Sequence, residues 1–259
     1  GFSEYGFPES HAASFALLVY ASCWIKCHHP AEFLAAMLNS QPLGFYSASQ
    51  LVQDAKRHGV EVRRVDVMSS EWDCTLEGLP HPPAVRLGLR LVAGLKAESA
   101  LRILKARRER SFDGAEDLAR RAEIEQHEMT LLAAADALMS LAGHRRQQVW
   151  EAAGQRSAPQ LLKQAPVNEE ELELPAAPEG EEVVWDYAAT GLTLRRHPLA
   201  ILRPVLAKQG WCTAAELHDL PDGRLARACG IVTVRQQPET AKGVMFVSLE
   251  DETGSVQVI

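Results

Sequence analysis

The chain has 259 residues and a mass of 28.5 kDa, enough for one large domain or for two to three small ones, each with its own apolar core. Hydrophobic residues make up 46% and charged residues 24% of the sequence, which excludes a wholly disordered, collagen-like or coiled-coil chain. The 27 Lys and Arg residues against 34 Asp and Glu residues give a net charge of −7. This charge excludes a uniformly basic nucleic-acid-binding surface but leaves room for a local basic patch.

The first 58 residues predict three helices. Apolar residues at spacings of three and four follow Ser10, a candidate N-cap, and they occupy nearly all sides of the first helix. Pro30 ends this helix and begins a second one over 31–39, and a third helix covers 49–58. A helix that is apolar on nearly all sides belongs inside a large domain, so we expect more chain to pack against it. Both ends of the sequence look cut.

Residues 60–121 predict two short strands followed by a basic helical unit. The strands cover 60–67 and 84–92, and a helix spans about 97–110. Between Arg86 and Arg121 there are ten basic and five acidic residues, a local net charge of +5 in a chain whose overall charge is −7. This segment is therefore the candidate for contact with a polyanion.

The remaining chain predicts short helices, a linker and a few strands. The helices cover 116–121, 125–135 and about 145–153. Residues 167–187 carry eight carboxylates, no basic residue and two prolines, which is typical of a linker. From residue 227 the apolar residues alternate with a period of two, as in the first strands of a small barrel. The acidic pair in the turn at 251–252 is interpreted as an ordinary turn.

The basic unit contains a helix-hairpin-helix pattern, whose apolar and glycine positions are met by Leu91, Val92, Gly94, Leu95, Ala100, Ile103 and Leu104. A tight hairpin before a helix directs backbone N–H groups outward, and the helix dipole favours a phosphate there. We predict sequence-independent, salt-sensitive contact with the DNA backbone from Gly94, Lys96, Arg102 and Lys105. Lys96 stands where this motif usually has a second glycine. The alternative is an ordinary solvated basic helix.

Cysteine usage and apolar length indicate a reduced, cytoplasmic protein. Five cysteines are spread over a long chain without a secretory leader, so we expect no disulfides. Cys23 and Cys27 share a helical face before two histidines, but structural zinc needs four converging ligands, so we predict buried thiols and no metal. The apolar segment 12–25 has 14 residues, whereas a membrane span needs about 20. We therefore expect no membrane contact.

Residues 5–20 and 24–33 closely resemble the fingers domain of bacterial C-family DNA polymerases of the DnaE type. Pro8-Glu9 before Ser10-His11 is similar to the error-prone (ImuC) branch, because replicative members usually carry Asn-Lys at that place. The same branch is indicated by 27–30 and 39–46. The resemblance continues through 66–67, the hairpin, 191–198 and 230–254, so it covers essentially the whole chain.

The resemblance implies a mainly α fragment, with fingers helices and a tandem helix-hairpin-helix, followed by a truncated β-barrel of the OB fold. It implies four parts, which are the C-terminal part of the fingers (1–83), the tandem helix-hairpin-helix domain (84–163), an acidic linker with connecting helices (164–225) and an incomplete OB fold (226–259). In this family the catalytic carboxylates and their Mg²⁺ belong to a palm domain that precedes the fingers. The resemblance therefore implies no catalytic residue here and no polymerase activity for the fragment alone.

The resemblance also implies a nucleotide site. Tyr5, Ser10 and His11 match family residues near the incoming nucleotide. An aromatic ring can lie against the sugar or base, and imidazole and hydroxyl groups can donate to triphosphate oxygens at the start of a helix. The alternative is that Ser10 is only an N-cap and Tyr5 only a packing residue.

The function implied by the resemblance is error-prone, DNA-directed DNA synthesis in damage-induced mutagenesis and translesion synthesis, on primer-template DNA with dNTPs. Replicative relatives carry a sliding-clamp-binding peptide after the hairpin domain, and 155–162 lacks its terminal aromatic. We therefore expect the clamp to be reached indirectly, through an ImuB-like companion protein. The alternatives are a non-catalytic DNA-binding module with hairpin and OB parts, and a protein-interaction scaffold.

Overall fold

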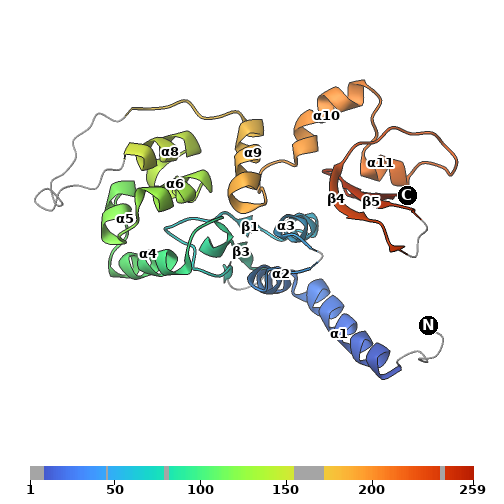
Figure 1. Cartoon of the computed structure of the whole chain (residues 1–259), viewed down its shortest axis with the longest axis horizontal. Helices are drawn as coiled ribbons and strands as arrows, with labels where there is room; N and C mark the ends of the chain where they lie inside the picture. Colours follow the sequence, from blue (N-terminus) through green and yellow to red (C-terminus); the bar gives the residue numbers. More distant parts are fainter. Residues whose placement is uncertain (1–8, 45, 79–81, 155–171, 240–242) are drawn as a thin grey trace, which may run out of the picture. The chain divides into compact units, whose positions relative to one another are not determined.

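The structure is a computed structural model, and it describes residues 9–44, 46–78, 82–154, 172–239 and 243–259 (Figure 1). The chain divides into two compact units. The larger unit contains 1–177 and 185–194, and the smaller unit contains 178–184 and 195–259. Helix α9 (Glu179–Thr190) contributes residues to both units.

The larger unit is mostly helical. Its helices are α1 (Glu9–His28), α2 (Pro30–Asn39), α3 (Ala48–Arg57), the 3₁₀ helix η1 (Leu89–Leu91), α4 (Ala97–Glu109), α5 (Ala115–Arg121), α6 (Gln126–Ala134), α7 (Met139–Ala142) and α8 (Arg145–Gly154). Its strands are β1 (Val62–Arg63), β2 (Thr75–Glu77) and β3 (Ala84–Arg86). The strand order is β1-β3-β2, with β1 parallel and β2 antiparallel to β3.

A single apolar core joins the elements that follow α1. It includes fully buried residues of α2, of the sheet and of the helical region, such as Leu38, Val85, Ile103, Leu118 and Leu132. The predicted helices after residue 30 are thus confirmed to within a few residues at their ends. The two predicted strands are much shorter than expected, because the chain bends into turns and η1 where a longer alternating pattern predicted one strand.

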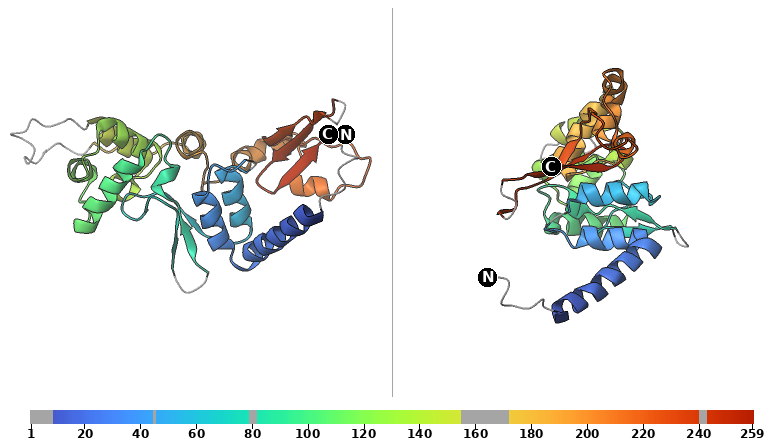
Figure 2. Two further views of the ribbon diagram at one scale, coloured as in Figure 1. Left: turned by 60° about the horizontal axis from the view of Figure 1, so that its bottom comes forward. Right: turned by 90° about the vertical axis from the view of Figure 1, so that its right-hand side faces the viewer.

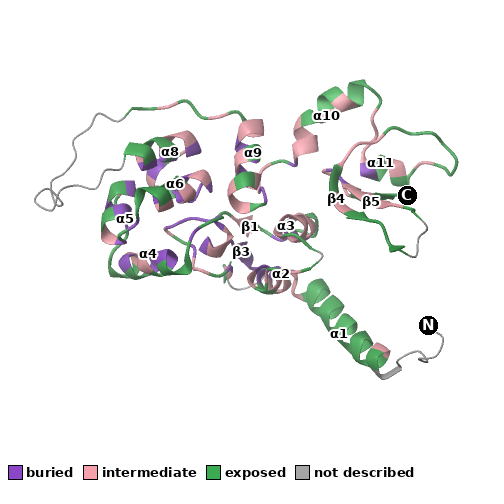
Figure 3. Cartoon of the chain, in the orientation of Figure 1, coloured by how far each residue is buried: buried purple, intermediate pink, exposed green. Residues whose placement is uncertain are grey.

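Helix α1 forms as predicted, but its apolar side chains are exposed. The large apolar side chains of its described part are exposed, for example Leu17 at 73% and Tyr20 at 73%, and Figure 3 colours almost the whole helix as exposed. Cys23 and Cys27, predicted to be buried, are exposed as well. Within the described chain α1 adjoins α2 and forms an ion pair from Lys26 to Asp54 at 2.7 Å. The prediction of buried thiols was wrong. An apolar pattern shows which side chains favour burial, but it does not show whether the described chain contains a segment that covers them.

The acidic segment predicted as a linker contains a helix, since α9 begins at Glu179. Asp186 on α9 is 7% exposed, and its carboxylate accepts hydrogen bonds from Arg145 and from the hydroxyl of Thr193. The carbonyl of Ala189 accepts from the N–H of Ala93 at 2.8 Å. The linker prediction was wrong for this half because a carboxylate that is paired inside a fold looks the same in the sequence as a solvated one.

The smaller unit contains α10 (Pro198–Lys208), α11 (Ala214–His218) and a three-stranded antiparallel sheet. The sheet has the order β4 (Ile231–Gln236), β5 (Phe246–Glu250) and β6 (Ser255–Val258), and Figure 2 shows the three strands side by side. A bulge interrupts the pairing between Val232 and Val234. The predicted strands are confirmed, and among the described residues they form a small open sheet.

The turn between β5 and β6 is more than an ordinary turn. Asp251 is 2% exposed, and its carboxylate accepts from the backbone N–H of Thr253 at 2.8 Å and from that of Ala214, at the start of α11, at 2.8 Å. Arg203 of α10 donates to both Asp251 and Glu252. Burial alone raises the pKa of Asp251, but the hydrogen bonds that it accepts outweigh this effect and lower the pKa below its ordinary value.

In the larger unit, Gly88 lies where two backbone segments meet. A Cβ at this position would lie 2.4 Å from the carbonyl oxygen of Trp72, which is closer than atoms can approach. The N–H of Gly88 donates to the thiol of Cys74 at 3.3 Å. Only glycine therefore fits here, just before the helical region begins.

We expect Gly88→Ala to lower the free energy of unfolding by about 2 kcal/mol, because the added methyl group must push two backbone segments apart. Gly114→Ala is the control, since no atom lies within 4 Å of a Cβ there, and it should cost well under about 1 kcal/mol. Urea unfolding followed by tryptophan fluorescence measures both. Equal stabilities of the two variants would contradict this account of Gly88.

We expect Asp251→Asn to reduce stability by about 2 kcal/mol at pH 7. The folded pKa of Asp251 is lowered, so its contribution is complete above the unfolded pKa of about 3.9 and is lost as the pH falls through the folded pKa. Urea unfolding followed by circular dichroism should therefore separate the variant from the parent chain at pH 7, and the gap should narrow as the pH is lowered below about 3.9. The exposed Asp222→Asn serves as control, and a pH-independent gap for Asp251→Asn would refute the expectation.

Candidate nucleic-acid interface

The predicted hairpin joins η1 to α4. Gly94 has a φ of +82°, a left-handed conformation that favours glycine, and a Cβ there would lie 3.3 Å from Leu131. Leu95 is buried beside the hairpin, and Ala100 and Ile103 are fully buried on the inner face of α4. The spacing that predicted the hairpin thus corresponds to the side chains that hold it in place.

The N-terminus of α4 is open to an anion. Lys96 is the N-cap, with an extended backbone and no hydrogen bond from its side chain to the helix. The first helical hydrogen bond runs from the N–H of Ala100 to the carbonyl of Lys96 at 3.2 Å. The N–H groups of residues 97–99 precede it and have no acceptor within the helix, so together with the helix dipole they favour a bound phosphate.

A second hairpin joins α5 to α6 and repeats the geometry of the first. Glu123 has a φ of +50° and takes the place of Gly94, and Glu125 is the N-cap in the place of Lys96. Met129 then takes the place of Ala100 and is likewise fully buried. The family resemblance implied a tandem arrangement but gave no residues for this second hairpin, in which Glu123 stands at the position of Gly94. The apolar spacing of 124, 129 and 132 was the available signal.

Most of the basic side chains between 86 and 121 are engaged within the larger unit. Hydrogen bonds to described residues are made by Arg86, Arg90, Arg102, Arg107, Arg110, Arg120 and Arg121. Arg108 forms an ion pair of 3.8 Å with Glu71 while its side chain stays 75% exposed. Lys96 and Lys105 are exposed and form no ion pair within the part of the chain that the structure describes. The local excess of positive charge is therefore presented mainly by these two lysines and Arg108.

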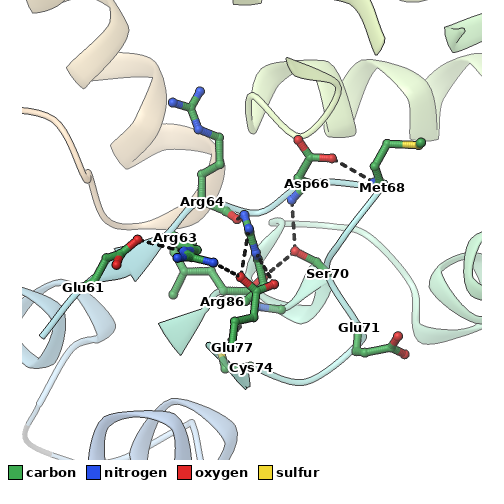
Figure 4. Close-up of polar contacts among 12 residues, drawn as sticks. Glu61, Arg63, Arg64, Asp66, Met68, Ser70, Glu71, Cys74, Glu77 and Arg86 are labelled. Carbon is green, nitrogen blue, oxygen red and sulfur yellow. Dashed lines mark hydrogen bonds and ion pairs between the residues drawn. The ribbon is translucent and has the colours of Figure 1, made fainter. Parts of the chain in front are cut away.

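Arg86 is one of the basic residues whose charge is paired within the larger unit. Figure 4 shows its guanidinium group against Glu77, and the Nε of Arg86 donates to that carboxylate at 2.9 Å. Arg63 on β1 donates to the same carboxylate at 2.8 Å. The hydrogen bond from Arg86, helped by Arg63, lowers the pKa of Glu77 although burial acts the other way. The Glu77 carboxylate thus connects all three strands of the sheet.

Arg102, a predicted phosphate ligand, faces the second hairpin. Its Nε donates to the carbonyl of Ala122 at 3.0 Å, and one terminal nitrogen donates to the carbonyl of Glu123 and to the carboxylate of Glu128, each at 3.2 Å. Its side chain is 37% exposed. Arg102 therefore connects the two hairpins, whereas Lys96 and Lys105 point to solvent.

The predicted nucleotide site is only partly covered by the structure. Tyr5 and the side chain of Ser10 lie outside the described residues. His11 is exposed in the first turn of α1, and the centroid of its ring lies 4.3 Å from the centroid of the Phe15 ring. The three predicted residues are therefore not seen together, and their role remains a prediction.

Among the residues that the structure describes, no group of three or more His, Cys, Asp or Glu side chains is placed to hold a metal ion. No described helix is long and apolar enough to cross a membrane. All five cysteines are free thiols, and the pKa of the buried Cys74 is raised, chiefly by burial.

Comparison with known proteins agrees with the geometry. A helix-hairpin-helix family model matches residues 59–148, which include both hairpins. The chain is 58% identical over 262 residues to an error-prone DNA polymerase of Bordetella parapertussis. It is 56% identical over 265 residues to one of Azoarcus sp. and 50% identical over 278 residues to one of Methylococcus capsulatus.

Each of these alignments covers 100% of this chain and 25% to 27% of the relative. The chain thus spans about a quarter of the length of the curated relatives that it matches. The predicted resemblance to the error-prone DNA polymerases is confirmed along the whole sequence. The presence of a helix-hairpin-helix domain is confirmed as well.

Proposed function

We propose that this chain is the DNA-holding segment of an error-prone, DNA-directed DNA polymerase. The observation that carries the proposal is 50–58% identity over the entire chain to proteins of that name. The first hairpin supplies a physical role that fits it, since its exposed glycine turn and open helix N-terminus suit a phosphate. The smaller unit, with its three-stranded sheet, then corresponds to the start of an OB fold, which binds single strands.

The DNA contact is assigned to the Gly94 turn and to two lysines. Lys96 lies at the N-terminus of α4, and Lys105 lies nine residues further along the helix. At a rise of 1.5 Å per residue and 3.6 residues per turn, the two residues lie about 14 Å apart along the axis and on different sides of the helix, so they do not share a phosphate. Neither contact depends on the bases, and the binding is therefore independent of sequence.

Tyr5, Ser10 and His11 are assigned to the incoming dNTP, on the family resemblance alone. His11 is exposed and able to donate to a triphosphate oxygen from the first turn of α1. The phosphoryl transfer itself is assigned to carboxylates and Mg²⁺ of a palm domain in the longer protein, where two metal ions stabilise the attacking and leaving oxygens. The described residues offer no donor set for these ions, so no catalytic step is assigned to them.

In the cell we assign the protein to translesion synthesis and damage-induced mutagenesis in the cytoplasm, together with an ImuB-like companion that reaches the sliding clamp. The segment compared with the clamp-binding peptide, 155–162, lies outside the described residues. Its missing aromatic anchor supports the indirect route. The first alternative, a non-catalytic DNA-binding module, differs by having no polymerase activity in the full-length protein.

We expect Lys96→Glu combined with Lys105→Glu to weaken binding to duplex DNA of any sequence while the fold stays intact. If each lysine neutralises about one phosphate, the slope of log K against log salt concentration shrinks by roughly two units. Fluorescence anisotropy with two unrelated duplexes at several salt concentrations measures this slope, and thermal melts check folding.

The matched control is Lys208→Glu combined with Arg224→Glu, because both residues are exposed in the smaller unit and the pair carries the same charge change. It should leave the slope for duplex DNA nearly unchanged. A slope that is unaffected by the hairpin variant, with unchanged melts, would show that the basic surface is only solvated and would support the scaffold alternative.

We expect the 259-residue chain alone to incorporate no nucleotide on primer-template DNA with dNTPs and Mg²⁺, because two-metal chemistry needs carboxylates assigned here to the palm domain. The full-length protein, assayed in parallel by primer extension, should be active. Incorporation by the purified chain would refute the assignment of catalysis to the palm, and an inactive full-length protein would favour the non-catalytic module.

A further inference from the structure

The two hairpins share a backbone geometry but carry opposite charges at the N-cap, although α4 also has Glu98 in its first turn. The first presents Lys96 at its N-cap, whereas the second presents Glu125 at its N-cap and Glu123 at the left-handed position. Glu128 follows as the third residue of α6. Such a cluster repels an anionic phosphate. The second hairpin is therefore unsuited to the DNA backbone, although its backbone conformation resembles that of the first hairpin.

Glu128 reaches from the second hairpin to the N-terminal turn of α4. One carboxylate oxygen accepts a hydrogen bond from the hydroxyl of Ser99, which lies in that turn and is 1% exposed. The other oxygen accepts from Arg102 at 3.2 Å and from the backbone N–H of Glu125 at 3.1 Å. A carboxylate from one hairpin is therefore held at the helix end that the other hairpin offers to DNA.

This carboxylate is charged at neutral pH. Burial raises the pKa of Glu128, but the hydrogen bonds from Ser99 and the Glu125 N–H outweigh burial. The positive charges of Arg102 and Lys96 act in the same direction, and the pKa of Glu128 lies below its ordinary value. The side chain of Glu128 is 14% exposed, so its charge is only partly screened by solvent.

We infer that Glu128 is an internal counter-anion that limits phosphate binding at the first hairpin. Its negative charge offsets the dipole of α4 and the charge of Lys96, both of which attract phosphate. Arg102 is committed to Glu128 and to two carbonyl groups, and it acts as a positioning residue that holds the carboxylate in place. The inference rests on the proposed DNA-holding function.

The test is duplex affinity of the 259-residue chain with Glu128→Gln and, separately, Glu128→Met. Both substitutions remove the charge, both residues are good helix formers, and glutamine keeps an acceptor for Ser99 and suits the third position of a capping box. We expect affinity to rise about two- to fivefold at low salt. The gain should shrink as salt is raised, because the lost repulsion is electrostatic.

Glu116→Gln is the matched control, since Glu116 is an exposed carboxylate in the first turn of α5 and the charge change is the same. It should leave the affinity nearly unchanged. Introduced beside Lys96→Glu and Lys105→Glu, the Glu128→Gln change should give no gain, because the phosphate contact that it relieves is gone. Thermal melts of each variant report folding separately from binding.

The outcomes separate the two ideas. If the lysine variant weakens binding but neither Glu128 variant strengthens it, or if Glu116→Gln gives an equal gain, the inference about Glu128 is overturned and the DNA-holding function stands. If the lysine variant has no effect on binding, the proposed DNA-holding function of the hairpin is contradicted, and the inference about Glu128 falls with it. A gain confined to the Glu128 variants and lost in the lysine background supports the inference.

Discussion

The helical part of the larger unit depends on a few residues with left-handed backbone conformation, at which one helix turns sharply into the next. Gly94 adopts this conformation without a steric penalty, but Glu123 and Asp136 adopt it with a side chain, at φ of +50° and +58°. Asp136 is buried and accepts hydrogen bonds from Gln148 and Arg64, which compensate the unfavourable backbone. The turns set which helix ends face solvent, and so they decide where a phosphate can approach.

The sequence predicted the first hairpin well because its signal is local. Gly94 and the apolar residues at 95, 100 and 103 report a turn and a buried face, and both follow from neighbouring residues alone. The partners of charged side chains do not follow in this way. Arg102 and Asp186 were interpreted as surface charges, yet each finds its partners on another element, and nothing in their local spacing distinguishes the two cases.

For helix α1 and the nucleotide site, the sequence predicted the local structure but not the surroundings of the side chains. The helical period of α1 was correctly predicted, but its exposed apolar side chains have no counterpart in the described chain that buries them. The chain covers 25% of the length of the Bordetella parapertussis relative. The role of Tyr5, Ser10 and His11 stays a prediction from the family resemblance, because Tyr5 and the side chain of Ser10 lie outside the described residues.

The attachment of α4 to the sheet has a mechanical consequence. Arg107, near the C-terminal end of α4, donates to the backbone carbonyls of Val67 and Ser70 and to the carboxylate of Glu71. Arg121 donates to the carbonyls of Ala106 and Arg110 at the same end of the helix. In the proposed DNA-holding role, a load on Lys105 passes through Arg107 to the loop that joins β1 and β2. Because the same end of α4 is also tied to Arg121, a pull there acts on two neighbouring elements as well as on the helix itself.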